Sequence, residues 1–175
     1  MSTLYLLIGG NEGDRQQMIL NATDLIRERI GSVVACSHMY ESSPWGVFAP
    51  NDNPQGFYNQ ALKVETSLSP LESLREAMCI ERLLGRQRVE ADGEIAQSAT
   101  ARVYKSRPID IDLIFYDSLV IETPELTIPH PRMHLRRFVL EPLSEIAPDM
   151  VHPLFHKTIS QLLDECTDNL SCYCC

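Results

Sequence analysis

The sequence of 175 residues lacks any long apolar segment: no stretch approaches the roughly 18 apolar residues that a membrane-spanning helix needs. The apolar run within the first ten residues, MSTLYLLIGG, is about half as long as the core of a signal peptide, and no basic residue precedes it. We therefore expect a soluble, cytoplasmic protein that does not associate with a membrane.

A disulfide framework is also missing. Of the six cysteines, three are scattered through predicted helices and strands, and three crowd the last four positions. This distribution fits a reducing cytoplasm better than a secreted, cross-linked protein. The final CYCC could bind a soft metal ion, but no histidine or CxxC pair accompanies it. We treat residues 166–175 as a Cys-rich tail that follows the folded domain.

Positive charge is scarce overall, since the net charge is −9, and this argues against a nucleic-acid partner. The charge is unevenly distributed, however. Between Arg82 and Arg137 nine basic residues face eight acidic ones, a net of +1, so the remaining six basic and sixteen acidic residues carry −10. Basic groups gathered in one part of an acidic chain indicate a small anionic ligand there.

Two common nucleotide-binding motifs are absent. The turn GGNEGD after the first predicted strand lacks the GK[ST] ending of a P-loop, and the sequence contains no GxGxxG. We therefore exclude a P-loop enzyme. The segment GGNEG itself allows two interpretations, a tight strand-to-helix turn that requires positive φ or a contact with a ligand.

The order of predicted elements indicates the fold. Periodicity and capping signals predict strands and helices in the order β-α-β-β-α-β, followed by further helices near residues 137–146 and 160–166. The strands fall near Leu4–Ile8, Val33–Tyr40 and Phe57–Thr66, and the strand that contains Asp110 and Asp112 is expected to form a hairpin with LVIETPELTI.

This order predicts an α+β fold, a ferredoxin-like sandwich of an antiparallel sheet with helices packed on it and extra C-terminal helices. Residues 1–165 would form a single domain. A doubly wound parallel sheet is the alternative, but the expected hairpin and the loop-linked strands after Val33 favour an antiparallel sheet.

The strand RPIDIDLIFYD carries two aspartates where a buried strand would be apolar. Asp110 and Asp112 lie two residues apart, on one face of a strand, so that their carboxylates could hold a pair of divalent cations. The alternative is that both aspartates face solvent while the other face forms the core. That core face would contain Ile109, Ile111, Leu113 and Phe115.

Five segments together resemble the 6-hydroxymethyl-7,8-dihydropterin pyrophosphokinase family, in order and over about residues 3–165. They are LLIGGNEGDR, YNQALKVETSLSPLESL, IERLLGRQR, RPIDIDLIFYD and LTIPHPRMHLRRFVLEPLSEIAP. The resemblance implies a ferredoxin-like fold and transfer of pyrophosphate from ATP to the hydroxymethyl group of the pterin, in folate biosynthesis. ATP and the pterin would be the small-molecule partners of a monomer.

The resemblance also implies roles for individual residues. Asp110 and Asp112 would hold two Mg²⁺ ions, and Arg86 and Arg88 would act in closure and transfer. The residues implied at ATP are Glu81, Tyr104, Arg107, His130 and Arg136. The residues implied at the pterin are Ser42, Trp45, Phe57, Asn59 and Phe138. The sequence departs from the family pattern at Met78, Tyr104 and Pro131.

Other functions remain open at this point. A γ-phosphoryl kinase of another small alcohol would release ADP instead of AMP, and a non-enzymatic ferredoxin-like module would bind no Mg²⁺–nucleotide. The polar stretch Gln87–Ser106 is too long for an ordinary connection, and we expect it to be a lid that orders over the bound ligands.

Overall fold

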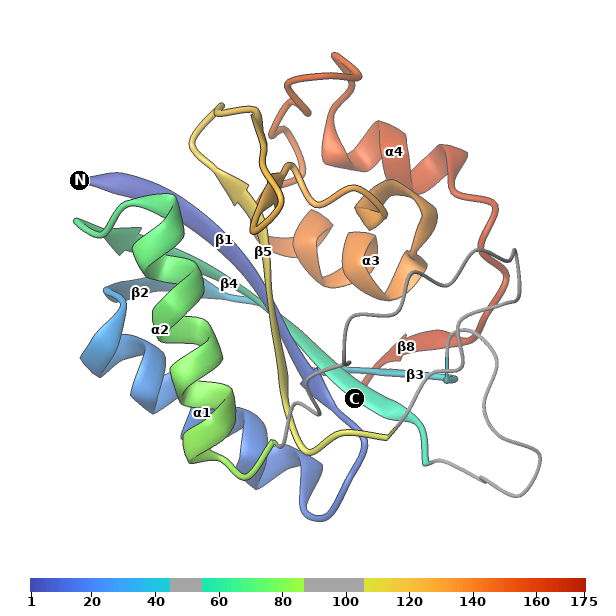
Figure 1. The fold of residues 1–175 in the computed structure, drawn as a ribbon. Coiled ribbons are helices and arrows are strands. Elements are labelled where there is room, and N and C mark those ends of the chain that lie inside the picture. Colours follow the sequence, from blue (N-terminus) through green and yellow to red (C-terminus); the bar gives the residue numbers. More distant parts are fainter. Residues whose placement is uncertain (45–54, 87–105) are drawn as a thin grey trace, which may run out of the picture.

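The computed structural model describes residues 1–44, 55–86 and 106–175, and its sheet is antiparallel (Figure 1). At its centre β1 (Ser2–Gly10) lies between β4 (Phe57–Thr66) and β5 (Asp110–Tyr116). The other edge of β4 pairs with two shorter strands, β2 (Ser32–Cys36) at one end and β3 (Tyr40–Ser42) at the other. The order β5-β1-β4-β2 is that of a ferredoxin-like sheet, so the predicted α+β sandwich is confirmed.

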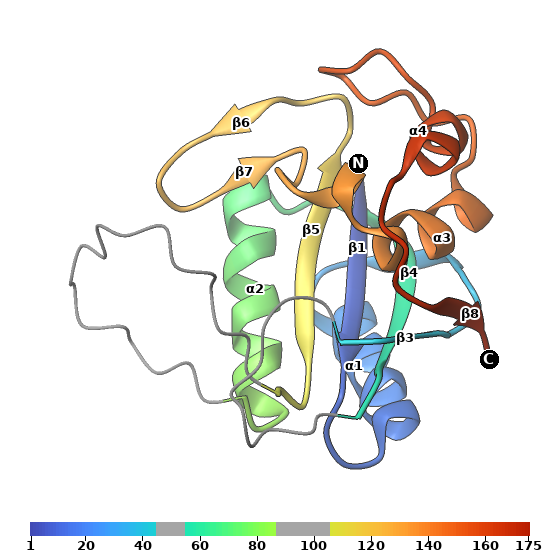
Figure 2. The same ribbon diagram turned by 90° about the vertical axis from the view of Figure 1, so that its right-hand side faces the viewer.

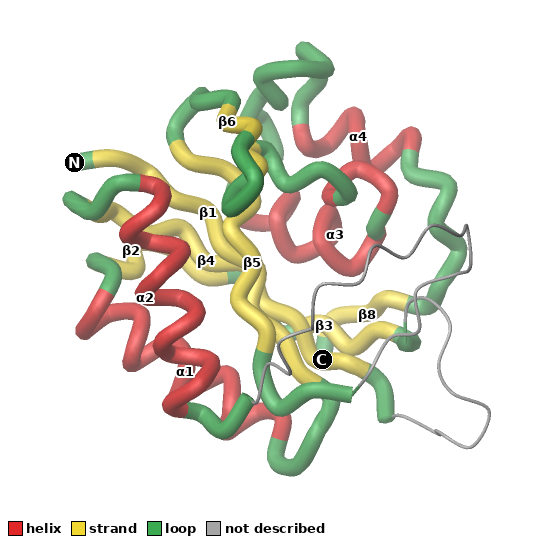
Figure 3. Tube along the Cα trace, in the orientation of Figure 1, coloured by secondary structure: helices red, strands yellow, loops and turns green. Residues whose placement is uncertain are grey.

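Two layers of helices cover the two faces of the sheet (Figures 1 and 3). On one face lie α1 (Arg15–Arg29) and α2 (Pro70–Leu83). On the other lie α3 (Arg137–Ile146) and α4 (Ile159–Glu165), which are the predicted C-terminal helices. None of the helices in the described ranges is both long and apolar enough to cross a membrane.

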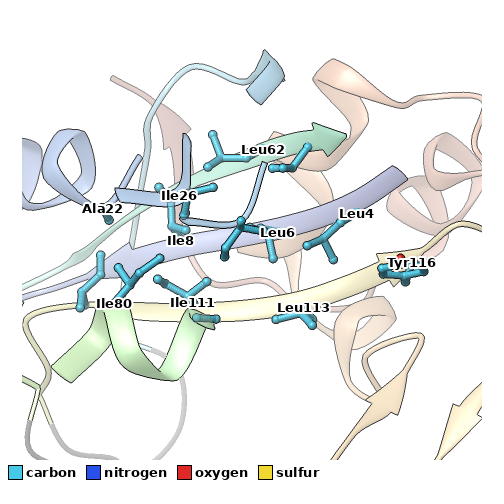
Figure 4. Packing of buried hydrophobic residues seen from close by; sticks show 14 of the residues in the cluster. Leu4, Leu6, Ile8, Ala22, Ile26, Leu62, Ile80, Ile111, Leu113 and Tyr116 are labelled. Atoms are coloured by element: carbon cyan, nitrogen blue, oxygen red, sulfur yellow. The ribbon is translucent and has the colours of Figure 1, made fainter. Parts of the chain in front are cut away.

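The central strand contributes to both layers because its side chains alternate between them. Leu4, Leu6 and Ile8 join the cluster under α1 and α2, and Figure 4 shows them beside side chains of both helices. Tyr5 and Leu7 join the cluster under α3 and α4. Burial on both faces explains why this strand reads as a continuous apolar run.

The predicted start of α2 is confirmed. Ser69 is the N-cap, and its hydroxyl accepts a hydrogen bond from the backbone N–H of Glu72, while the Glu72 carboxylate accepts one from the Ser69 N–H at 2.8 Å. This capping box satisfies two backbone donors that a helix N-terminus otherwise leaves unpaired. In the last turn of the same helix, Glu81 accepts a hydrogen bond from the backbone N–H of Ile111 in β5.

The single strand predicted over Val33–Tyr40 is wrong, because the segment divides into β2 and β3. Between them Ser37 bonds directly to β4: its hydroxyl accepts from the N–H of Ala61, and its N–H donates to the Ala61 carbonyl, both at 3.0 Å. This side-chain bond replaces a rung of the backbone ladder, so the chain changes course before β3 begins.

The predicted hairpin between β5 and LVIETPELTI is also wrong. That segment folds on itself, and β6 (Ile121–Glu122) pairs with β7 (Thr127–Ile128) in a separate two-stranded sheet (Figure 2). The strand β5 pairs with β1 instead, and a register shift near Tyr5 leaves Ile114 as an extra residue. This bulge turns Phe115 into the α3–α4 layer, away from the face of Leu113.

The last residues of the chain extend the sheet. Within residues 166–175, which the sequence suggested as a tail, β8 (Cys172–Cys174) pairs antiparallel with β3. Figure 1 shows the two strands side by side near the C-terminus. All six cysteines are free thiols, and the three near the C-terminus lie in or directly after β8.

Candidate active site

A cavity of about 560 Å³ opens on the α3 side of the sheet, above β1, β4 and β5. It collects residues that are far apart in the sequence. Most of the site residues named from the sequence line it: Ser42, Phe57, Asn59, Arg86, Arg107, Asp110, Asp112, His130, Arg136 and Phe138.

The two aspartates lie on the cavity face of β5. In the ladder with β1, Asp110 is opposite Gly9 and Asp112 opposite Leu7, and all four residues line the cavity. Ile109, Ile111 and Leu113 point the other way, into the core under α1 and α2. The carboxylates therefore share one face, as their spacing predicts, and that face is a cavity between sheet and helix, not open surface.

Two arginines hold Asp110. The Arg86 guanidinium donates to Oδ1 and the Arg107 guanidinium to Oδ2, the latter at 2.7 Å. Burial acts to raise the pKa of Asp110, but the charges of Arg107 and Arg86 outweigh it, and the pKa lies below its usual value. Asp110 is thus ionised, with both oxygens engaged.

Asp112 is in the opposite situation. Burial, and then the negative charge of Asp110, raise its pKa to about 7. Both causes disfavour the ionised form, and a bound cation would counteract both. The residues therefore fit a divalent metal site.

The described residues contain no group of three or more His, Cys, Asp or Glu that could hold a metal by itself. Asp110 and Asp112 offer two carboxylates, and Mg²⁺ commonly takes one or two carboxylates and completes its shell with water and substrate phosphates. The pair therefore suits Mg²⁺ that arrives with a nucleotide.

Glu81, expected at the nucleotide, lies behind the cavity wall and is only 1% exposed. Its Oε1 accepts from the Ile111 N–H at 2.8 Å and from the Arg86 guanidinium at 2.7 Å. One buried carboxylate thereby connects α2 to the backbone between the two aspartates and to the arginine that bonds Asp110. In this structure Glu81 positions groups that line the cavity and is not itself among the lining residues.

At the end of the cavity formed by β4, the side chain of Asn59 is a buried amide. Its Nδ2 donates to the Ser42 hydroxyl at 3.0 Å. Gly9 lies against it, and a Cβ at that position would collide with Oδ1 of Asn59. Phe57 from β4 and Phe138 from α3 line the same cavity. The amide is therefore held in one orientation close to two aromatic side chains.

His130 is a neutral imidazole in this site. Its Nδ1 accepts from the Arg132 N–H at 3.2 Å, which leaves the proton on Nε2. Burial and the charge of Arg136 lower its pKa to about 4. Arg136 itself is 9% exposed and lies 5.7 Å from the centre of the Phe138 ring. His130 can thus donate a hydrogen bond to an anion at neutral pH.

Several lining residues had no role predicted from the sequence, namely Leu7, Gly9, Ser43, Pro131 and Arg132. Gly9 had a signal in GGNEG, for which a ligand contact was one interpretation. The other interpretation, a turn that requires positive φ, holds for Gly13, whose φ is +61°. It does not hold for Gly9 and Gly10, which belong to β1. Both strand glycines are needed for close approach: a Cβ on Gly10 would collide with the Pro108 carbonyl.

Three predicted site residues, Trp45, Arg88 and Tyr104, lie outside the described residues, as does the expected lid apart from Ser106.

The fold and the cavity together define a class of protein, an enzyme for small anionic substrates in which a carboxylate pair and several guanidinium groups face one cavity. The sequence model of the 7,8-dihydro-6-hydroxymethylpterin-pyrophosphokinase (HPPK) family matches residues 5–148. The chain belongs to this family.

Individual relatives agree with this assignment. The 2-amino-4-hydroxy-6-hydroxymethyldihydropteridine pyrophosphokinase of Porphyromonas gingivalis is 36% identical over 154 residues, 87% of this chain and 95% of that protein. Its counterpart in Aquifex aeolicus is 35% identical over 175 residues, 100% and 98% of the two chains. A crystal structure of Plasmodium falciparum HPPK-DHPS matches with a TM-score of 0.69 at 17% identity, over 94% of this chain and 43% of that one. This last likeness bears on the fold alone.

The protein is therefore an ATP-dependent pyrophosphokinase of folate biosynthesis with a pterin substrate. The γ-phosphoryl kinase and the non-enzymatic module, both open from the sequence, are set aside by this assignment.

Proposed function

We propose that the enzyme transfers pyrophosphate in one step, by in-line attack of the pterin hydroxymethyl oxygen on the β-phosphorus of ATP, with AMP as leaving group. The observation that carries this proposal is the placement of Asp110 and Asp112 on the cavity face of β5, in the same cavity as the Asn59 amide. A carboxylate pair suited to Mg²⁺–nucleotide and an amide suited to a heterocycle edge then face one reaction space.

Asp110 and Asp112 would hold two Mg²⁺ ions together with the phosphate oxygens. Bound there, the ions would neutralise negative charge on the triphosphate as the β-phosphorus is attacked. The raised pKa of Asp112, caused by burial and by Asp110, supports this assignment because a cation would relieve both effects.

Arg86 and Arg107 would exchange partners during binding. In the structure both guanidinium groups are directed at Asp110, and both line the cavity. Once cations neutralise Asp110, these groups can turn to phosphate oxygens, for which arginine is well suited. Glu81 keeps Arg86 near the site throughout, because the bond between them does not involve Asp110. His130 and Arg136 would complete the phosphate side.

Asn59 would read the edge of the pterin. Its amide offers both a donor and an acceptor, matching the two kinds of group on a pyrimidinone edge. Phe57 and Phe138 would stack on the two faces of the ring, and Ser42 would hold the amide in place. The described aromatic residues and the amide thus have separate roles, stacking and edge recognition.

Nucleotide analysis tests the reaction, and calorimetry tests the site. The enzyme incubated with ATP, Mg²⁺ and 6-hydroxymethyl-7,8-dihydropterin should form AMP and the pterin diphosphate in equal amounts. Without pterin, labelled ATP should leave no label on the protein. In a titration with Mg²⁺ and a non-hydrolysable ATP analogue, Asp112→Asn should abolish cation-dependent binding, while Asp164→Asn, on the exposed face of α4, should bind normally. ADP as product, or normal Mg²⁺-dependent binding in Asp112→Asn, would refute the respective assignment.

The enzyme would act in the cytoplasm, where a reducing environment keeps its six cysteines as thiols. We further propose that it acts as a monomer, and sedimentation at enzyme concentrations used in assays would measure this directly.

A further inference from the structure

The segment that follows α4 contacts two walls of the cavity that are distant in sequence. Residues 166–174 run from the end of α4 past the start of α3 to β8, as Figure 2 shows. This segment lies beyond residues 5–148, which the family model matches. The match to the family model therefore does not by itself account for its contacts.

The first wall is the N-terminus of α3. The N-cap residue of this helix, Arg136, forms no side-chain cap. Asp168 caps the helix from a distance instead, because its Oδ2 accepts from the Arg137 N–H at 3.0 Å. Its backbone carbonyl also accepts from Nε of Arg137 at 3.0 Å, and the Cys166 carbonyl from Nη2 at 3.2 Å. The neighbours of Arg137 on both sides, Arg136 and Phe138, line the cavity.

The second wall is β3, a strand of only three residues. On one side it pairs with β4, where the Ser42 hydroxyl accepts from Asn59. On its other side it pairs with β8, and the Ser43 N–H donates to the Ser171 carbonyl at 3.0 Å. Ser42 and Ser43 both line the cavity. Without β8 this wall would be the exposed edge of a short strand, which is a weakly held element.

We infer that residues 166–174 form a strap that sets the width of the pterin pocket, and that Asp168 is a positioning residue for pterin binding. The strap joins the helix that carries Phe138 to the strand that carries Ser42. This inference rests on the proposed placement of the pterin between Phe57, Phe138 and Asn59.

The strap should matter less for the nucleotide. Its hydrogen bonds described above go to α3 and β3, whereas Asp110, Asp112 and Arg107 lie on or beside β5, at the opposite edge of the sheet. The affinity for a ligand that contacts both α3 and β3 depends on the distance between these two elements. The affinity for a ligand that is bound mainly by β5 depends less on that distance. Loss of the strap should therefore act selectively on the pterin.

The primary test compares Asp168→Ala with Asp168→Asn and with Asp164→Ala. Alanine removes the acceptor for the Arg137 N–H, whereas asparagine keeps one oxygen there. Asp164→Ala removes an equally charged, exposed side chain four residues earlier, in the last turn of α4, as the matched control. Calorimetry on the full chain would give the dissociation constants for the pterin and for the Mg²⁺–ATP analogue separately.

Asp168→Ala should weaken pterin binding about five-fold, the equivalent of one lost helix cap, and change nucleotide binding less than two-fold. In turnover assays KM for the pterin should rise while kcat changes little. Asp168→Asn should recover most of the affinity, and Asp164→Ala should match the unchanged protein.

A second variant tests the β3 side. Tyr173→Pro removes one backbone donor from the ladder between β8 and β3, leaving Asp168 in place. It should produce the same pterin-selective loss, with a melting temperature and circular dichroism that show a folded protein.

The outcomes separate this inference from the proposed function. If the unchanged protein binds no pterin, the proposed pocket is wrong. If it binds pterin and Asp168→Ala binds equally well, the strap does not position the pocket. If pterin and nucleotide affinities fall together, in step with the melting temperature, the segment is only a structural support and the inference is overturned.

Discussion

The two faces of the sheet use the same strands for different purposes. Under α1 and α2 a cluster of apolar side chains and Tyr116 closes around Leu6, Ile80 and Ile111. On the α3 face the apolar cluster covers only part of the sheet, and beside it Asp110, Asp112 and Asn59 line a cavity. Alternation along β5 connects the two, since Ile111 separates the aspartates and points to the opposite face. One face therefore supplies an apolar core, which lets the other carry the polar groups of the cavity.

The largest expected effect comes from Asp112→Asn, which should nearly abolish turnover and leave the apolar core unchanged. Turnover should fall at least 1,000-fold, on the order of 4 kcal/mol of transition-state stabilisation. Stability without metal should rise by up to about 4 kcal/mol at pH 8. The sign follows from the pKa, which folding raises to about 7 through burial and Asp110, so stability is lost as pH rises from the unfolded value toward 7.

Urea unfolding at pH 5 and pH 8, beside a turnover assay, measures both effects. Asp110→Asn is the matched comparison, because its carboxylate has two arginine partners and its loss should lower stability. Equal stability changes in the two variants would contradict the contrast between these carboxylates.

Ile80→Ala, on the other face, should lower stability and leave turnover nearly unchanged. Ile80 is fully buried in the α1–α2 layer, and a cavity in its place should lower the free energy of unfolding by about 2 to 5 kcal/mol. The folded fraction should still turn over at a near-normal rate, since Ile80 is not among the residues that line the cavity. A kcat reduced more than ten-fold in fully folded protein would show that the two faces are not independent.

Asn59→Ala should separate pterin binding from nucleotide binding within the cavity. It leaves the pterin edge unpaired, and pterin binding should weaken by roughly 1 to 3 kcal/mol. Binding of the Mg²⁺–ATP analogue should change much less. Calorimetric titration of each ligand decides this, with Gln60→Ala as the control, because Gln60 is the next residue of β4 and bonds the Ser37 carbonyl. Equal losses for both ligands would mean that the pterin pocket is misplaced.

Arg86→Met should strengthen cation binding to the nucleotide-free enzyme, because the Arg86 guanidinium forms an ion pair with the Asp110 carboxylate in the structure. We expect Mn²⁺ affinity, measured by electron paramagnetic resonance, to rise by about 1 kcal/mol, the scale of one ion pair near a protein surface. Arg132→Met removes the same charge from the same cavity and should act more weakly. If the two variants behave alike, Arg86 affects the cation only through the general charge of the cavity.

The smallest effect is a pH dependence on the α3 face. His152 is buried there beside Phe115, and its Nδ1 accepts from the backbone N–H groups of Leu154 and Phe155. Burial lowers its pKa to about 4, so folded protein excludes a proton that the unfolded chain binds below about pH 6.5. Stability should therefore fall as pH drops from 6.5 toward 4. Urea unfolding of His152→Asn should show a shallower fall, and an unchanged slope would contradict this assignment.

The sequence by itself determined the elements whose signals are local. The capping box at Ser69, the strand Phe57–Thr66 and the helices near residues 137–146 and 160–166 follow from hydrogen bonds and periodicity between near neighbours. The shared face of Asp110 and Asp112 follows from the two-residue period of a strand. The chemistry proposed for that face came with the family resemblance, since two aspartates facing solvent would have had the same spacing.

Only the tertiary structure decided which groups meet. The bond of Glu81 to the Ile111 N–H, the contact of Gly9 with Asn59 and the pairing of β8 with β3 join residues from 30 to more than 100 positions apart. Likewise, the bond from Ser37 to Ala61 divided a predicted strand, and the pairing of β5 with β1 replaced a predicted hairpin. Such contacts leave no periodic trace in the sequence, because each depends on where the sheet brings two distant segments together. Local patterns specify a residue's face, and packing specifies what that face meets.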